Sequence, residues 1–547
     1  MHVLLTTFNS SFIHKNLALR WLYVAAPPTV SVDFKEYIVG DDIEPIVQMI
    51  IKEGYDVVGM STYIWNVNET KALINALSVS APHIKIVLGG PEVTYENDDW
   101  FSLPISGIVL GEGERVFWDF VIHQDDTYVK IAAHTFKPIR KEEIAYLEQL
   151  SSPYALDVDV NNMDRQYLYV EASRGCPFRC TYCLSSLDNH VRFFSLDYLE
   201  KVFESVKTFD IKQVKFLDRT FNAHKQRTIA LYEMLDHYQN VESFQVEIVA
   251  DRLDETLINL IIDDRFKDRI RYEIGIQSYN QKTLESVDRS QDNDRLNKVI
   301  NILLEHKVVL HTDLIAGLPY EDLDSFKASF NALAALYPTE LQLGILKLLR
   351  GTKMKSLALQ LEYTYNKEAP YEVHGSPWLS EAEMDEIMCV AEGVSRSINR
   401  NILRYTIKYL AEYVYDYNYF DVYYDFGKIF KILNLKYQRY DLFKEIYTEY
   451  KNRVDKQHLQ SVLLSDYLNN QKQKPKELFT GENMKDKKRE LVESKLFTQE
   501  EVYRYSSLYY DYRSDDTLIM SLYNSEQKSN SVYSINLKEN VCKKISY

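Results

Sequence analysis

The sequence of 547 residues is poor in cysteine and has no long apolar run. Each of these absences excludes a class of protein. Five cysteines in a chain of this length exclude a scaffold built on disulfides. No stretch approaches the roughly 20 apolar residues that a membrane-spanning helix needs, so no membrane insertion is expected. The apolar run Val3–Leu5 is far shorter than the hydrophobic region of a signal peptide. We therefore expect a cytoplasmic protein, in a compartment where thiols stay reduced.

Positive charge is also in deficit. The chain has 64 lysines and arginines against 80 aspartates and glutamates, which gives a formal net charge of -16. Proteins that bind nucleic acid by neutralising phosphates show the opposite balance, so generic nucleic-acid binding is not expected. A hydrophobic share of 46%, a charged share of 26% and a mean hydropathy of -0.33 are typical of a folded protein. The length indicates three or four domains.

Residues 1–125 read as alternating strands and helices. The expected strands are Val3–Thr7, Val32–Phe34, Asp56–Ser61, Ile84–Leu88 and Ile105–Leu110. Near-continuous apolar strands separated by helices predict a parallel sheet covered on both faces, here an α/β, flavodoxin-like (Rossmann-type) domain. A ligand of such a domain lies beyond the carboxyl ends of the strands. Gly89, Gly90 and Gly111 fall there, either to let a ligand approach the backbone or simply as loop glycines.

After a connector at residues 126–164, a second alternating series occupies residues 165–360. Its expected strands are Leu168–Ala172, Gln213–Leu217, Phe244–Val249, Arg271–Gly275, Val308–Ile315 and Leu341–Leu346. Six βα units of this length predict a partial TIM-type (βα)6 barrel, with its chemistry at the carboxyl ends of the strands.

Residues 361–547 lack the alternation of strands and helices found in the preceding segments, and we expect a mainly helical C-terminal domain there. Residues 380–465 have helical spacing and many tyrosines, which we interpret as core rather than as a base-stacking surface. The lysine-rich stretch Lys472–Glu490 is typical of a solvated linker. Alternation around Thr517–Leu522 and Ser531–Leu537 predicts a short antiparallel sheet.

Three of the five cysteines, Cys176, Cys180 and Cys183, lie within eight residues, directly after the first strand of the second series. Three thiolates on one loop can bind three irons of a [4Fe–4S] cube and leave the fourth iron open to another ligand. The alternative is a zinc site with His190 as fourth ligand, but zinc sites favour two ligand pairs and no second pair is present. An iron–sulfur cluster is the favoured interpretation.

The C-x3-C-x2-C spacing, with an aromatic residue before the last cysteine, resembles the radical S-adenosylmethionine (SAM) superfamily over roughly residues 165–350. The resemblance implies that Cys176, Cys180 and Cys183 hold a [4Fe–4S] cluster whose open iron binds SAM. It further implies that an electron from the cluster cleaves SAM, giving a 5′-deoxyadenosyl radical, and that the protein supplies placement and exclusion of side reactions.

Five further residues match the family's SAM-binding positions. Tyr182 corresponds to the aromatic near the adenine, and Asp218 to the residue that contacts the SAM amino group. Glu273 and Gln277 lie in the fourth-strand motif, and Arg252 follows the third strand, where it could pair with the SAM carboxylate or remain a surface arginine. The resemblance extends to a fifth-strand motif at residues 313–319.

A flavodoxin-like domain before such a barrel is similar to the cobalamin (B12)-binding subgroup of this family. The resemblance places Ser61, Gly89, Gly90 and Glu112 beside cobalamin. The cobalt-ligating Asp-x-His-x-x-Gly motif is absent, and His14, the nearest match, is interpreted as a helix-start or polar pocket residue rather than as a ligand. Cobalamin then binds without a protein histidine, or the domain no longer binds it.

The subgroup resemblance implies methyl transfer to an unactivated carbon or phosphorus, with electrons from a reductant such as flavodoxin or ferredoxin. The alternatives are a radical rearrangement or cyclisation with the same cofactors, and a non-catalytic cobalamin or iron–sulfur sensor. A second cluster, as in methylthiotransferases, is disfavoured because Cys389 and Cys542 stand alone. The sequence names neither a substrate nor a directly catalytic side chain.

Overall fold

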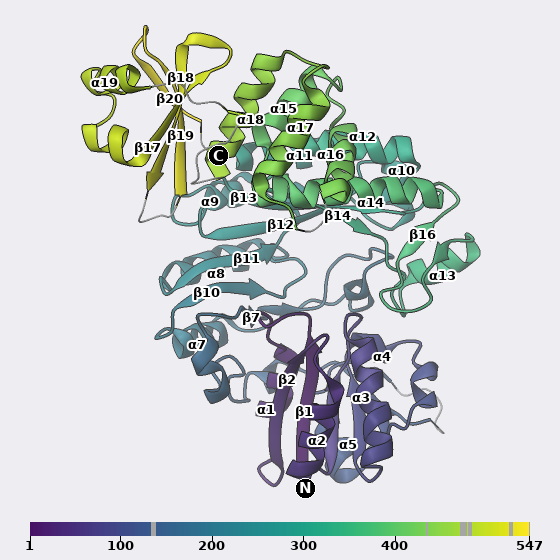
Figure 1. The fold of residues 1–547 in the computed structure, drawn as a ribbon. Coiled ribbons are helices and arrows are strands. Elements are labelled where there is room, and N and C mark those ends of the chain that lie inside the picture. Colours follow the sequence, from purple (N-terminus) through teal and green to yellow (C-terminus); the bar gives the residue numbers. More distant parts are fainter. Residues whose placement is uncertain (133–137, 434–435, 471–477, 480–483, 525–528, 546–547) are drawn as a thin grey trace. The chain divides into compact units, whose positions relative to one another are not determined.

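In the computed structural model, the described residues are 1–132, 138–433, 436–470, 478–479, 484–524 and 529–545. Contacts divide them into two compact units (Figure 1). The first unit contains residues 1–310, 317–321 and 345–380. The second contains residues 311–316, 322–344 and 381–547. No helix within these described ranges is long and apolar enough to cross a membrane.

The first unit begins with a six-stranded sheet of order β2-β1-β3-β4-β5-β6. Its strands are β1 (His2–Asn9), β2 (Ser31–Ile38), β3 (Val57–Ser61), β4 (Lys85–Gly89), β5 (Gly107–Val109) and β6 (Val129–Lys130). β1 to β5 are parallel in flavodoxin-like order, which confirms the predicted domain type. The antiparallel edge strand β6 was not predicted, because two residues carry no periodic signal.

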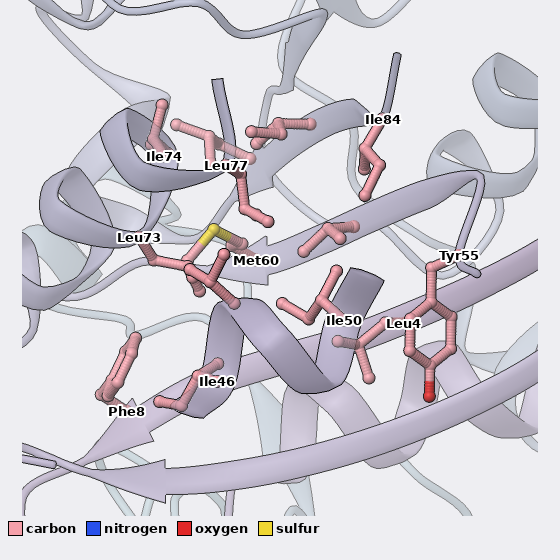
Figure 2. Packing of buried hydrophobic residues seen from close by; sticks show 14 of the residues in the cluster. Leu4, Phe8, Ile46, Ile50, Tyr55, Met60, Leu73, Ile74, Leu77 and Ile84 are labelled. Carbon is pink, nitrogen blue, oxygen red and sulfur yellow. The ribbon is translucent and has the colours of Figure 1, made fainter. Parts of the chain in front are cut away.

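Helices cover both faces of this sheet (Figure 1). They are α1 (Leu17–Val24), α2 (Ile43–Glu53), α3 (Val67–Ser80), α4 (Pro91–Thr94) and α5 (Val116–His123). Side chains of a strand alternate between faces, so Leu4 packs into one core while Val3 packs into the other. Figure 2 shows the first core, where Ile46 and Ile50 of α2 and Leu73 of α3 meet the sheet. Burial on both faces explains why these strands are apolar throughout.

A second six-stranded sheet has the order β14-β13-β12-β11-β10-β7. Its strands are β7 (Leu168–Val170), β10 (Ile211–Phe216), β11 (Val241–Glu247), β12 (Ile270–Gln277), β13 (Val309–Ala316) and β14 (Glu340–Ile345). The pairs β7–β10, β10–β11 and β11–β12 are parallel. Four parallel strands in chain order, β7, β10, β11 and β12, agree with the first four strands of the predicted partial barrel.

Helices connect these strands, and most begin at a polar residue whose side chain accepts a hydrogen bond from the first turn, as Ser195 does for α7. They are α7 (Leu196–Val206), α8 (Lys225–Asp236), α9 (Glu255–Ile261), α10 (Gln281–Ser286), α11 (Asn293–Glu305) and α12 (Leu323–Ala334). Smaller elements of the first unit are α6 (Ile144–Leu147), β8 (Ser173–Arg174), β9 (Arg192–Phe193), α13 (Lys353–Gln360), β15 (Thr364–Tyr365) and β16 (Val373–Gly375).

The second unit contains a group of helices and an antiparallel sheet, as predicted for residues 380–465 and for the segments near 517–522 and 531–537. The helices are α14 (Glu381–Arg396), α15 (Arg404–Tyr413), α16 (Tyr419–Leu433), α17 (Arg439–Tyr450) and α18 (Lys456–Asn470). The sheet contains β17 (Ser506–Asp511), β18 (Ser514–Asn524), β19 (Ser529–Asn536) and β20 (Val541–Lys544) in that order.

The linker predicted for Lys472–Glu490 is wrong where the structure describes its second half. Helix α19 (Lys485–Glu493) begins there and buries Leu491 against the antiparallel sheet. Its charged residues are the solvated face of an amphipathic helix, which a charge count cannot distinguish from a linker. Residues 472–477 and 480–483 lie outside the described residues.

Candidate cofactor site

The cysteine loop follows β7 and is held in a shape that requires glycine before its first cysteine. Gly175 has a φ of +91°, and a Cβ added to it would lie 2.4 Å from the His190 carbonyl oxygen. Because the backbone at Gly175 lies so close to the backbone at His190, the Cys176 N–H can donate to the Asp188 carbonyl, at 2.9 Å. His190 itself is exposed, and its carbonyl rather than its imidazole carries this contact.

Backbone hydrogen bonds fix the rest of the loop to two other elements of the first unit. The Thr181 N–H donates to the Val287 carbonyl after α10, and the Thr181 carbonyl accepts from the Met354 N–H at the start of α13, both at 3.0 Å. The Cys183 N–H donates to the Cys180 carbonyl at 3.1 Å. The loop is therefore positioned by the barrel as well as by its own turn.

The three thiols of the cysteine loop differ in burial. Cys176 and Cys180 are buried and Cys183 is half-buried. Burial raises the pKa of Cys176, and the neighbouring Cys183 and Cys180 raise it further. No three His, Cys, Asp or Glu side chains among the described residues converge on one metal ion. The assignment of these thiols to a [4Fe–4S] cluster stays a prediction.

Arg289, which the sequence analysis did not single out, lies against this loop. One guanidinium nitrogen is 3.9 Å from Cys180 Sγ and 3.5 Å from the Tyr182 hydroxyl, and the other donates to the Gly275 carbonyl of β12. Burial raises the pKa of Tyr182, against the opposing effect of Arg289. Arg289 thus brings a positive charge beside thiolates and ties the loop to the fourth barrel strand. Its sequence context carries no motif that could have identified it.

Asp218 is buried directly after β10 and faces the start of the cysteine loop. Its carboxylate accepts from the Ala172 N–H at 2.8 Å and from the Ser173 hydroxyl at 2.5 Å. Burial raises its pKa to about 6, in opposition to these hydrogen bonds. Asp218 follows the carboxyl end of β10, and its assignment to the SAM amino group stays a prediction.

The side chain of Gln277 has a buried oxygen that could accept a hydrogen bond from a ligand. Its backbone has a φ of +69°, and its buried Oε1 has no hydrogen-bond partner in the described part of the chain. Such an atom costs free energy unless a ligand or water satisfies it. Glu273, on the same face of β12, accepts from Gln245 Nε2 at 3.0 Å. Arg252 is exposed and contacts the Ser290 hydroxyl only weakly, at 3.4 Å.

The carboxyl ends of β3 and β4 in the first sheet present the residues predicted to face cobalamin. A Cβ added to Gly89 would meet only Val109 Cβ, at 4.0 Å, so the space above this strand end is open. Gly90 has a φ of +106° and approaches Thr62, whose buried Oγ1 has no hydrogen-bond partner among the described residues. Ser61 is buried, and its carbonyl accepts from the Thr7 hydroxyl. An open strand end beside an unsatisfied hydroxyl fits a bound ligand.

Glu112, also predicted beside cobalamin, lies in a buried ionic cluster that joins the first sheet to the cysteine loop. Its carboxylate accepts from Arg174 at 2.9 Å and pairs with Arg192, and these two arginines hold its pKa below the ordinary value despite burial. Arg174 also contacts Glu114 at 2.7 Å and Glu171 at 2.9 Å. The turn after β5 and the residue before Gly175 are therefore locked together.

His14 contacts β7, the first strand of the second sheet. Its Nδ1 is 2.5 Å from the Tyr169 hydroxyl of β7, and burial followed by the charge of Lys215 lowers its pKa. This contact gives the imidazole the polar-pocket environment expected from the sequence.

Comparison with known families identifies both parts of the first unit. A model described as "Radical SAM superfamily" matches residues 170–333, and a model described as "B12 binding domain" matches residues 6–121. The chain therefore contains a radical SAM domain and a B12-binding domain. A third model, "Protein of unknown function (DUF4080)", matches residues 360–540.

Two curated relatives of this radical SAM protein are named as methyltransferases. The cobalamin-dependent radical SAM methyltransferase TokK of Streptomyces tokunonensis is 23% identical over 310 residues, which are 51% of this chain and 44% of that protein. The uncharacterized methyltransferase PH0819 of Pyrococcus horikoshii is 28% identical over 211 residues, 34% of this chain and 44% of that protein. The chain thus spans less than half the length of these relatives.

Two solved structures share the fold. The radical SAM methyltransferase TsrM from Kitasatospora setae, with cobalamin and a [4Fe–4S] cluster bound, gives a TM-score of 0.56 at 15% identity, covering 70% of this chain and 83% of that one. The cobalamin-dependent SAM radical enzyme OxsB, with aqua-cobalamin and SAM bound, gives 0.59 at 15% identity, covering 85% and 78%. The radical SAM domain implies a [4Fe–4S] cluster and SAM as cofactors, and the B12-binding domain implies cobalamin.

Proposed function

We propose that the protein is a cobalamin-dependent radical SAM enzyme that transfers a methyl group to an unactivated carbon or phosphorus centre. The observation that supports this most is the Arg174–Glu112 junction, because it holds the cysteine loop against the turn after β5 of the B12-binding domain. Two cofactors that act on one substrate must lie close together, and this junction fixes the two loops beside each other.

Different residues of the chain are assigned to each cofactor. We assign Cys176, Cys180 and Cys183 to the cluster, with Arg289 as the cation beside it. When bound, the cluster supplies the electron that cleaves a carbon–sulfur bond of SAM, and cobalamin supplies a methyl carrier. Gln277 offers an unsatisfied amide oxygen to SAM. Ser61, Gly89 and Gly90 are assigned to the cobalamin side of the site.

The remaining assignments belong to the same proposal. Tyr182, Asp218, Arg252 and Glu273 are assigned to SAM on their matching motif positions. Glu112 is assigned to the cobalamin side of the site, and its carboxylate also pairs with Arg174. The proposed domains are residues 1–125 for cobalamin, 126–164 as connector, 165–360 for the radical SAM core and 361–547 for a C-terminal domain specific to the family. A flavodoxin or ferredoxin in the cytoplasm is the proposed electron donor.

The names of the two curated relatives favour methyl transfer over the alternatives. The test uses the full chain, reconstituted without oxygen with cluster and cobalamin and supplied with SAM labelled in its methyl group. Incubated with a metabolite extract from cells that lack the gene, it should transfer the labelled methyl to at least one compound, and the Cys180→Ala variant should not. Formation of 5′-deoxyadenosine with an altered but unlabelled compound would instead support the rearrangement or cyclisation. If neither product forms, the result would support the third alternative, a non-catalytic sensor.

A further inference from the structure

A positively charged cavity lies within the second unit, in the part of the chain matched by the family of unknown function. Its volume is about 350 Å³, and three arginines but only one glutamate are among its lining residues. Arg396 ends α14, Arg400 ends the short 3-10 helix η5 (Ile398–Arg400), and Arg439 begins α17. Three separate elements thus direct guanidinium groups toward one space.

The single carboxylate neutralises only one of the three cations. Glu392 accepts from Arg396 at 3.0 Å, one helical turn away on α14. Arg396 is buried, with its guanidinium 4.6 Å from the centre of the Phe430 ring and 5.1 Å from that of Tyr437. These contacts hold Arg396 in place as one wall of the cavity rather than as a free anion ligand.

The other two cations keep their charge available. Arg439 donates to the Asn470 carbonyl at 3.1 Å, a neutral acceptor that leaves the positive charge uncompensated. Arg400 is exposed, and its side chain has no hydrogen bond or ion pair within the described ranges of the chain. The lining therefore carries two unpaired positive charges, in a chain whose net charge is -16. Two uncompensated guanidinium groups that line one cavity create a positive local potential, which an anion in the cavity would neutralise.

Size and donor chemistry define the class of anion. Small-molecule sites have volumes of about 300 to 1,000 Å³, so this cavity is suited to a small molecule rather than to a macromolecule. The planar guanidinium fork donates two parallel hydrogen bonds to phosphate or carboxylate oxygens. Phosphate has three such oxygens and a charge close to −2 at neutral pH, which matches the two unpaired cations.

We propose that this cavity binds a small organic phosphate, with its phosphate group between Arg400 and Arg439 and the Tyr437 ring beside it. This site lies beyond the proposed function, since none of its residues belongs to the cluster, SAM or cobalamin assignments. Its occupancy does not depend on SAM cleavage, so the two proposals can fail separately.

The test is calorimetric titration of the full chain with glycerol 3-phosphate, inorganic phosphate and succinate, at low ionic strength. We expect saturable binding of one glycerol 3-phosphate per chain, at least tenfold weakened in Arg400→Ala and in Arg439→Gln. The matched control is Arg489→Ala, because Arg489 is an exposed arginine of the same unit on α19 and should leave binding unchanged. Unchanged melting temperatures of the variants exclude misfolding, and Arg400, which is exposed, tests the site even if the Arg439 variant is unstable.

Three results would overturn the proposal. The first is absence of saturable binding of either phosphate at millimolar concentration. The second is binding that survives in Arg400→Ala. The third is tighter binding of succinate than of glycerol 3-phosphate, which would assign the cavity to carboxylates.

Discussion

The guanidinium of Arg174 lies 2.9 Å from the carboxylate of Glu112, across the junction between the B12-binding domain and the cysteine loop. Glu114 and Glu171 contact the same guanidinium, and all four side chains are largely buried. Arg174 stands two residues before Cys176, so these ion pairs join the turn after β5 to the start of the cysteine loop. The junction is thus a positioning element as well as a structural one.

Replacing Arg174 by alanine should be strongly destabilising. The change leaves three carboxylates buried without their common cation, and breaking such a buried pair costs about 3–5 kcal/mol. We expect a lower free energy of unfolding in denaturant titration, together with a reduced iron content per chain. The control is Arg504→Ala, which removes an exposed pair with Glu500 and should change stability by only about 0.5 kcal/mol. Equal losses in both variants would contradict the role of the junction.

Gly175→Ala should prevent cluster assembly through a local clash. The added Cβ would lie 2.4 Å from the His190 carbonyl oxygen, at a φ that alanine rarely adopts. Gly40→Ala has a similar φ of +94° but nothing within 4 Å, so it separates backbone strain from the clash. We expect iron content to fall sharply for Gly175→Ala and to stay unchanged for Gly40→Ala. A Gly175→Ala protein with full iron content would show that the loop adjusts.

Asp466 provides a pH test in the second unit. Its buried carboxylate accepts from the backbone N–H groups of Tyr405 and Thr406 at the start of α15, and burial raises its pKa to about 7. A carboxyl whose pKa is higher in the folded state binds more protons there than in the unfolded chain. Between its ordinary pKa, near 4, and about 7, stability therefore falls as the pH rises, on the order of 4 kcal/mol in all.

The Asp466→Asn variant lacks this titration. The unfolding free energy of the natural protein minus that of the variant should therefore decrease from pH 4 to pH 7 and then level off. Denaturant titrations at several pH values measure this difference. A difference that is constant over the range, or that rises with pH, is incompatible with a raised pKa.

Much of the fold could be predicted because its signals are local. The strands of both parallel sheets are short apolar runs, and polar caps such as Asp254 mark where helices begin. The cysteine loop could be recognised in the sequence because Cys176, Cys180 and Cys183 are closely spaced and stand directly after a strand. Cys389, interpreted as a small apolar residue, is buried in α14 and packs where α14 crosses α16 at Gly427.

The rest depends on contacts between residues far apart in the chain. Arg289 reaches Cys180 across 109 positions, and nothing beside Arg289 in the sequence marks it as part of the site. The pairing of Glu112 with Arg174 depends on how two domains meet, which no periodicity encodes. Burial of Leu491 on α19 was missed because a lysine-rich helix and a linker have the same composition.

We propose that Cys176, Cys180 and Cys183 together hold a [4Fe–4S] cluster that cleaves SAM. The most direct test is the iron and sulfide content of anaerobically reconstituted protein, followed by reduction in the presence of SAM. We expect about four irons and four sulfides per chain, with formation of 5′-deoxyadenosine. Cys180→Ala should abolish 5′-deoxyadenosine formation, while Cys389→Ala, the matched control, should retain it. Zinc without sulfide in the natural protein, or SAM cleavage that persists in Cys180→Ala, would contradict the account.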